Sequence, residues 1–206
     1  MQSLLHVGCG PKRKDKTTAG FNAPQWHEIR LDIDASVQPD VTGTMTDMSM
    51  VASASVDAVF SSHNIEHLYP HEVPLALKEF LRVLRDEGFA VITCPDLQSV
   101  CALVAQDRLT EPAYHSAAGP IAPIDILYGH RPPMARGNLY MAHRCGFTRK
   151  VLGSTLEAAG FQAVATLVRP SQFELWALAS KSARTEAQMR ELALAHFPQP
   201  PRTTTA

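Results

Sequence analysis

Hydrophobic and polar residues along the chain follow two different periods. Short apolar runs that stop at polar or glycine residues predict β-strands. We expect these strands over residues 3–7, 28–33, 56–61 and 89–94, with a shorter one near 41–45. Residues 11–25 lack helical periodicity and contain Gly20 and Pro24, so we expect a loop or one short helix there.

Helical spacing is clearest in HEVPLALKEFLRVLRDEG, residues 71–88. Its apolar positions recur every three or four residues at Val73, Leu77, Phe80, Leu81 and Leu84. Such spacing predicts an amphipathic helix, and Gly88 is the expected C-terminal cap. Leu97 to Leu109 also has a helical pattern.

The second half of the chain shows the same two periods with a different arrangement. A helix is predicted between Thr148, a typical N-cap, and Gly160, a typical C-terminal stop. Two strands over 161–168 and 173–179 are separated by RPSQ, which predicts a hairpin turn. Residues 182–197 are a further helix candidate.

These elements predict an α/β protein. Strands and helices alternate in the first half, which favours a mostly parallel sheet, and the closing strand pair predicts an antiparallel edge. We expect one domain over 1–197, with 97–147 as an insertion that is poor in regular structure between Pro112 and Asn138. The tail, residues 198–206, is expected to be disordered.

Composition narrows the class of protein further. The 206 residues are 45% hydrophobic and 19% charged, with a formal net charge of -1. This balance gives no general attraction for phosphate backbones, so a nucleic-acid partner is not expected. No apolar run reaches the ~20 residues of a membrane span and no signal-peptide pattern stands at the start, so we expect a cytoplasmic protein without a membrane partner.

A glycine turn between two predicted strands gives the first indication of chemistry. The run LLHVGCG ends in Gly8 and Gly10, and Asp32 ends the next strand. Glycine permits close approach of a ligand to the backbone, and a carboxylate can accept both hydroxyls of a ribose. On its own the GxG pattern is weak, because many strands turn through glycine for steric reasons.

The pattern becomes more specific further along the chain. Read together, TDMSMVASASVDAVFSSHNIEHLYP and EFLRVLRDEGFAVITCPD resemble the class I S-adenosylmethionine-dependent methyltransferases, particularly a small subgroup with SSHxxEHL. The likeness covers roughly residues 3 to 100, and the distal YGHRPPMARGNLYMAHRCGFTRKVLGSTLEAAGF is also similar to that subgroup. It implies a Rossmann-like fold with a seven-stranded, mostly parallel sheet, helices on both faces and an antiparallel C-terminal hairpin.

The resemblance also implies roles for individual residues and S-adenosylmethionine as cofactor. The loop Gly8, Cys9 and Gly10 would line the methionyl and ribose part, and Asp32 would bind the ribose hydroxyls, with Asp34 as a competing candidate. Asp47 would accept a hydrogen bond from the adenine amino group. The backbone of Met48 would meet the adenine ring, and Ser62 and His63 would lie beside the reactive methyl group. The alternative for Asp32 and Asp47 is a purely local turn or cap role.

The glycine loop departs from the family pattern. Gly10 is followed by Pro11 and three cations, and Arg13 stands where a dinucleotide site needs its third glycine. The loop therefore disfavours a nicotinamide-dependent oxidoreductase, whose cofactor carries a pyrophosphate. S-adenosylmethionine has no phosphate to bind, so the missing glycine counts less against it. A catalytically inactive S-adenosylmethionine-binding module or partner subunit remains the alternative to an enzyme.

Histidines are the candidates for proton transfer in methylation of a hydroxyl or an amine. His63, His67 and His143 are the residues we select, and a backbone-only role is the alternative for His63. No metal site is expected, because His63, His67 and His71 have no firm ligand spacing to carboxylates. Four cysteines without CxxC spacing are expected to be reduced thiols.

Charge in the distal segment bears on the methyl acceptor. No acidic residue lies between Asp125 and Glu157, whereas five cations do: Arg131, Arg136, Arg144, Arg149 and Lys150. If this segment faces the site, it presents a positive field to the substrate. We therefore hypothesise a small anionic acceptor. The alternative is a solvated loop whose arginines pair with acids elsewhere.

Overall fold

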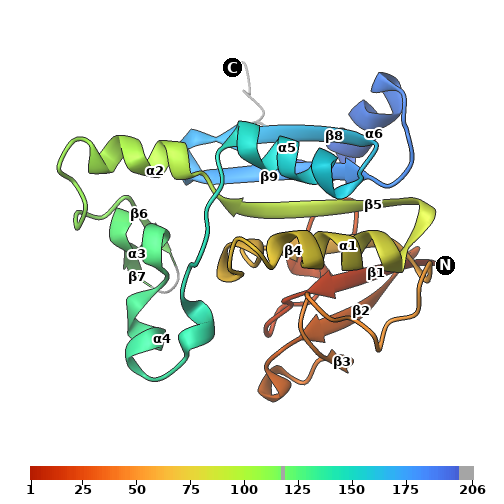
Figure 1. Cartoon of the computed structure of the whole chain (residues 1–206), viewed down its shortest axis with the longest axis horizontal. Coiled ribbons are helices and arrows are strands. Elements are labelled where there is room, and N and C mark those ends of the chain that lie inside the picture. The colour runs from red at the N-terminus through yellow and green to blue at the C-terminus, as the bar shows by residue number, and fades with distance from the viewer. Residues whose placement is uncertain (117–118, 200–206) are drawn as a thin grey trace, which may run out of the picture.

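A computed structural model describes residues 1–116 and 119–199. Its main sheet has seven strands in the order β3-β2-β1-β4-β5-β9-β8 (Figure 1). The strands are β1 (Gln2–Val7), β2 (Trp26–Asp32), β3 (Val41–Thr42), β4 (Val56–Ser62), β5 (Leu84–Pro95), β8 (Ala163–Arg169) and β9 (Glu174–Ser180). The first five run parallel, and β9 is antiparallel to both β5 and β8. The predicted sheet and its antiparallel edge hairpin are confirmed.

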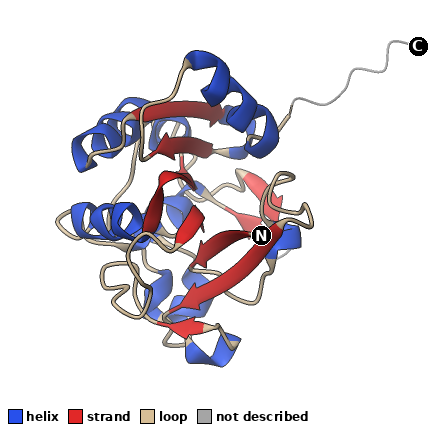
Figure 2. Cartoon of the chain, turned by 90° about the vertical axis from the view of Figure 1, so that its right-hand side faces the viewer, coloured by secondary structure: helices blue, strands red, loops and turns tan. Residues whose placement is uncertain are grey.

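Helices cover both faces of this sheet (Figure 2). The covering helices are α1 (Val73–Val83), α5 (Arg149–Ala159) and α6 (Glu186–His196), whereas α2 (Leu97–Val104), α3 (Pro123–Tyr128) and α4 (Arg131–Ala135) belong to the segment between β5 and α5. One face packs against Leu77 and Phe80 of α1 and Leu152 of α5, all fully buried. The opposite face packs against Phe21 and against Met189 of α6. Among the described residues, no helix is both long and apolar enough to cross a membrane.

The predicted helix ends are partly right. Thr148 caps α5 by accepting a hydrogen bond from the amide of Val151, and Gly160 ends it in a left-handed conformation, as expected. The prediction that Gly88 caps α1 is wrong, because the helix stops at Val83 and the chain continues directly into β5. Gly88 lies inside β5, where a Cβ would stand 2.9 Å from the carbonyl oxygen of Arg85. A close backbone approach, and not a cap, requires glycine there.

Other element boundaries also differ from those predicted. Helix α2 ends at Val104, five residues before the predicted end, and α6 begins at Glu186 instead of Ser182. The expectation of little regular structure between 112 and 138 is wrong, since this segment contains the hairpin β6 (Tyr114–Ser116) and β7 (Gly119–Ile121) as well as α3 and α4. Predicted disorder of the tail falls, from residue 200 on, outside the described residues.

Residues 97–147 lie at one end of the sheet, beyond the point where β5 ends (Figure 1). The 3-10 turn η3 (Ile65–His67), which follows β4, connects the sheet to this segment. Its Glu66 carbonyl oxygen accepts hydrogen bonds from the amides of Arg144 at 2.8 Å and Cys145 at 3.2 Å. The loops that follow parallel strands share this end of the sheet, which is where open α/β sheets bind ligands.

Candidate functional site

The loop after β1 holds two glycines in the left-handed region, with φ of +63° at Gly8 and +51° at Gly10. At Gly8 a Cβ would stand 2.1 Å from Nδ2 of Asn64, so any larger residue would displace the Asn64 side chain in the loop after β4. At Gly10 nothing lies within 4 Å of the Cβ position. Cys9 between them is buried, and burial raises the pKa of its thiol to about 11, so the thiol stays protonated. Open space is therefore found on the Gly10 side only.

Asp32 at the end of β2 is joined to this loop. One carboxylate oxygen accepts a hydrogen bond from the amide of Gly10 at 2.7 Å, and the other accepts one from the amide of Asp34 at 2.9 Å. A carboxylate offers about four acceptor positions, so further donors can still bind. The competing Asp34 is exposed and accepts a hydrogen bond from Ser36 at the start of a short 3-10 turn. The geometry favours Asp32.

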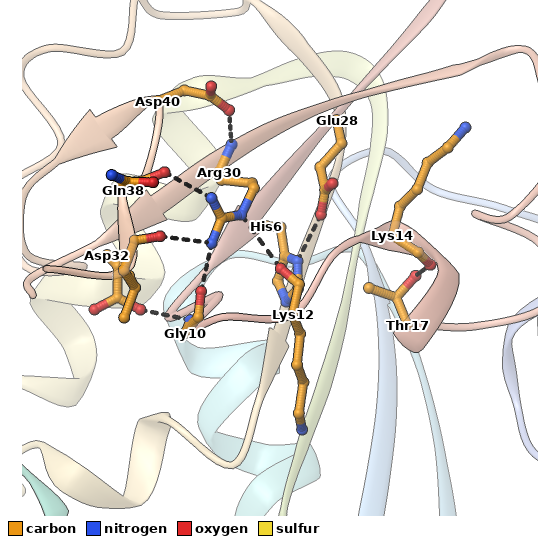
Figure 3. A network of polar contacts seen from close by, with 11 residues as sticks. His6, Gly10, Lys12, Lys14, Thr17, Glu28, Arg30, Asp32, Gln38 and Asp40 are labelled. Atoms are coloured by element: carbon orange, nitrogen blue, oxygen red, sulfur yellow. Dashed lines mark hydrogen bonds and ion pairs between the residues drawn. The ribbon is translucent and has the colours of Figure 1, made fainter. Parts of the chain in front are cut away.

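Sequence reasoning missed Arg30. Its buried guanidinium donates to the carbonyl oxygens of Gly10 and Lys12 in the glycine loop and to those of Val37 and Gln38 in the loop after β2 (Figure 3). Arginine can serve several acceptors at once because its five N–H donors form a rigid fork. One side chain thus connects two loops. Its hydrogen bonds hold the glycine loop in place although that loop lacks the usual third glycine. Nothing in the alternating pattern of the strand marks this arginine.

The residues predicted to contact adenine, Asp47 and Met48, already take part in hydrogen bonds within the chain. Asp47 is exposed, and its carboxylate accepts a hydrogen bond from the amide of Ser49 at 3.1 Å. Met48 is buried, and its amide donates to the carboxylate of Glu79 at 2.7 Å. The carbonyl oxygen of Met48 accepts from Arg82 at 2.8 Å. Asp47 keeps acceptor capacity, whereas the polar backbone groups of Met48 are already bonded within the chain.

Ser62 is the last residue of β4, and His63 follows it. The hydroxyl of Ser62 lies 2.8 Å from that of Thr93, and the amide of His63 donates to the Thr93 carbonyl oxygen at 2.9 Å. His63 has a φ of +50°, which is uncommon for a residue with a side chain. This conformation turns its ring toward two carboxylates, with Nε2 3.0 Å from Glu174 and Nδ1 3.5 Å from Glu66.

The two carboxylates set the charge of His63. Partial loss of solvation lowers its pKa, but the hydrogen bond to Glu174 and the negative charges of Glu66 and Glu174 outweigh that loss and raise the pKa to about 9. The imidazole therefore carries its proton at neutral pH. A protonated imidazole cannot accept a proton, so this environment disfavours His63 as a base and suits it to an electrostatic role. No local pattern marks Glu174, which lies 111 residues away in the chain.

His67 and His143 come together although 76 positions separate them. Their ring centroids are 4.9 Å apart, and Glu66 stands beside them with a side chain that is 1% exposed. His71 is exposed and stacks on Tyr69 instead. The structure thus groups His67 and His143 with Glu66, whose carboxylate is also 3.5 Å from Nδ1 of His63. This set differs from the His63, His67 and His71 trio considered from the sequence.

Comparison with known proteins bears on the domain and the fold. Residues 5–92, from β1 through most of β5, match the family model described as a methyltransferase domain. No curated protein sequence is significantly similar to the chain.

Solved structures share the whole fold. A Burkholderia thailandensis 1,6-didemethyltoxoflavin-N1-methyltransferase, solved with 1,6-didemethyltoxoflavin and S-adenosylhomocysteine, aligns with a TM-score of 0.56 and 17% identity over 88% of this chain and 71% of that one. A methyltransferase from Archaeoglobus fulgidus described as SAM dependent aligns with a TM-score of 0.56 and 15% identity over 87% and 86% of the two chains. A possible histamine N-methyltransferase from Thermotoga maritima aligns with a TM-score of 0.54 and 15% identity over 88% of this chain and 83% of that one. The expected class I methyltransferase fold is confirmed.

Proposed function

We propose that this protein is an S-adenosylmethionine-dependent methyltransferase. The observation that carries the proposal is the bond between the Asp32 carboxylate and the Gly10 amide at 2.7 Å, which sets an acid beside a two-glycine loop at the ligand-binding end of the sheet. The match of residues 5–92 to a methyltransferase domain and the S-adenosylhomocysteine in a structural neighbour support this cofactor.

In the proposed reaction the acceptor atom, an oxygen or a nitrogen, attacks the methyl carbon of the sulfonium. The new bond to carbon forms as the carbon–sulfur bond breaks, the sulfur keeps the electron pair, and S-adenosylhomocysteine leaves. An acceptor that carries a proton on that atom then releases it to water. No covalent intermediate with the enzyme is needed, and the protein contributes mainly alignment of the reactants and exclusion of water.

Each cofactor group has a proposed partner in the chain. Asp32 accepts hydrogen bonds from the ribose hydroxyls with the lone pairs that the backbone leaves free. Asp47 accepts one from the adenine amino group beside Met48, and the loop Gly8 to Gly10 faces the methionyl part. Ser62 and His63 lie on the side of the transferred methyl group, where a protonated His63 would favour electron-rich acceptors.

The acceptor is proposed to be a small anionic molecule that residues 97–147 help to cover. Among the described residues, Arg131 is the only one of the five distal cations with an ion pair, at 2.6 Å to Asp125. Arg144 bonds a carbonyl oxygen and Arg149 a hydroxyl, and the exposed Arg136 and Lys150 have no side-chain partner in the described part of the chain. These cations retain positive charge that neighbouring acids do not neutralise.

The test of the proposed function is calorimetry with S-adenosylhomocysteine. Wild-type protein should bind it, and Asp32→Asn and Asp47→Asn should each weaken binding by about ten- to a hundredfold, because each loses a charge-assisted bond worth about 1.5–3 kcal/mol. Asp86→Asn is the matched control, since that side chain is 90% exposed and far from the loop in sequence. Absence of binding to the wild type would contradict the proposal. So would an affinity in both variants that equals that of the wild type.

Transfer itself needs a second measurement. Labelled S-adenosylmethionine and a panel of small acceptors should yield a methylated product with the wild-type protein. Cofactor binding with no transfer across that panel would instead favour the inactive binding module.

A further inference from the structure

Three side chains at the junction of sheet and insertion offer ligand atoms to a common centre. Glu66 and His67 belong to η3, and His143 comes from the segment that returns from α4. One carboxylate oxygen and one ring nitrogen from each histidine all lie within 4.8 Å of one another. Backbone bonds from Arg144 and Cys145 to the Glu66 carbonyl oxygen hold the two segments together independently of these side chains.

Glu66 is a buried carboxylate without enough partners. Its side chain is 1% exposed, and neither carboxylate oxygen has a hydrogen-bond partner among the described residues. The closest cation is His63, whose Nδ1 stands 3.5 Å from one oxygen and whose Nε2 already serves Glu174. Burying an ionised carboxylate costs several kcal/mol unless hydrogen bonds or a cation compensate it. The second oxygen of Glu66 therefore points to a missing positive ligand.

The hydrogen bonds of both histidines leave one ring nitrogen free for a ligand. Nδ1 of His67 lies 3.1 Å from the carbonyl oxygen of Ala142, and Nδ1 of His143 lies 2.7 Å from that of Ile126. A carbonyl oxygen only accepts, so in each ring Nδ1 carries the hydrogen and Nε2 keeps its lone pair in the neutral form. Metal-bound histidines typically donate their second ring N–H to a carbonyl or a carboxylate in this way.

We propose that Glu66, His67 and His143 bind a divalent transition-metal ion of the zinc class, through the Glu66 carboxylate and Nε2 of both histidines. Two imidazoles and one carboxylate suit zinc, whereas magnesium and calcium prefer oxygen ligands alone. Glu66 and His143 also line a cavity of about 10 Å³. That is close to the space that a single water molecule needs.

Three protein ligands leave at least one coordination position open, as in catalytic zinc sites. The open position takes water, or an acceptor atom if the proposed methyl transfer is correct. In this arrangement His67 and His143 are ligands and do not act as free bases. Cation binding itself does not depend on methyl transfer, so it can be tested without an acceptor.

The experiment uses the tag-free full chain after treatment with a chelator. Addition of Co²⁺ should give visible absorption bands, and calorimetry should show one Zn²⁺ bound per chain, with no response to Mg²⁺. Glu66→Gln, His67→Asn and His143→Asn should each weaken Zn²⁺ binding more than about tenfold, which is the lower bound for losing an outer-shell partner of a metal ligand. The asparagines keep an amide donor near the position of Nδ1, so the bonds to the backbone carbonyls can persist.

His27→Asn is the matched control, because His27 is an exposed histidine on β2 outside this group. It should bind Zn²⁺ like the wild type. Circular dichroism shows which variants are folded, and the folded ones decide. Absence of Co²⁺ and Zn²⁺ binding by the wild type would overturn the proposal. So would folded ligand variants that bind Zn²⁺ as tightly as the wild type does. S-adenosylhomocysteine calorimetry on the chelator-treated chain separates this outcome from failure of the proposed function.

Discussion

Gly8 and the Asn64 side chain are in such close contact that a Cβ on Gly8 would stand 2.1 Å from Nδ2 of Asn64. The contact joins the loop after β1 to the loop after β4. These are the loops to which we assign the methionyl part of the cofactor and the reacting methyl group. Packing at Gly8 therefore fixes the spacing between the two halves of the candidate site.

Replacement of the two loop glycines should separate stability from binding. Gly8→Ala combines a left-handed backbone with a clash, so the free energy of unfolding should fall by about 2–4 kcal/mol. Gly10→Ala has the backbone strain alone and should lose only about 1–2 kcal/mol. Its methyl group would enter the open side of the loop, so S-adenosylhomocysteine affinity should fall more than stability does. Urea unfolding and calorimetry measure the two effects, and equal unfolding free energies for both variants would contradict this assignment.

Arg30 should be needed for both stability and cofactor binding. Arg30→Met removes every guanidinium bond to the two loops while keeping an unbranched side chain, and we expect a loss of about 1.5–3 kcal/mol in unfolding free energy. The glycine loop should then also bind S-adenosylhomocysteine more weakly. Arg13→Met is the control in the same loop, since Arg13 is exposed and its side chain makes no hydrogen bond or ion pair in the described part of the chain. Identical behaviour of the two variants in both measurements would argue against a structural role for Arg30.

Sequence pattern predicted the sheet well because strand periodicity and turn residues are local signals. The end of α1 was missed because the chain passes from Val83 into β5 without a glycine turn, and Gly88 serves a close contact with Arg85 instead. The site divides in the same way. Asp32 and the glycine loop follow from neighbouring strands, whereas the approach of His143 to Glu66 and His67 depends on the path of the insertion, which no local pattern encodes.

An anionic acceptor should make turnover sensitive to salt and to distal charge. Ionic strength of about 0.15 M screens charges beyond roughly 8 Å, so KM for an anionic acceptor should rise with added salt while that for a neutral acceptor stays constant. Arg136→Gln and Lys150→Gln should each raise KM for the anionic acceptor about 1.5- to 5-fold, which corresponds to 0.2–1 kcal/mol for an exposed charge. Lys78→Gln on α1 is the control. A KM that is independent of salt for every anionic acceptor would leave the distal cations as a solvated surface.

His196 should make the fold sensitive to acid. Its ring is 5% exposed, its Nδ1 lies 2.7 Å from the hydroxyl of Thr18, and its centroid is 4.2 Å from that of Phe21. Burial lowers its pKa from the ordinary value of 6.5 to about 4. The folded state therefore disfavours the charged ring, and the unfolded chain binds the proton first as the pH falls.

The loss of stability should begin near pH 6.5, grow as the pH falls and level off near pH 4, where the folded protein also binds the proton. The full effect is about 3 kcal/mol, at 1.36 kcal/mol per pKa unit. Urea unfolding across this range should show a shallower pH dependence in His196→Asn, which keeps a hydrogen-bonding group near Thr18 but cannot titrate. His6 is also buried with a lowered pKa, so some acid sensitivity should persist in that variant. His27→Asn, at an exposed position, should follow the wild type, and an unchanged slope in His196→Asn would show that His196 is not the titrating group.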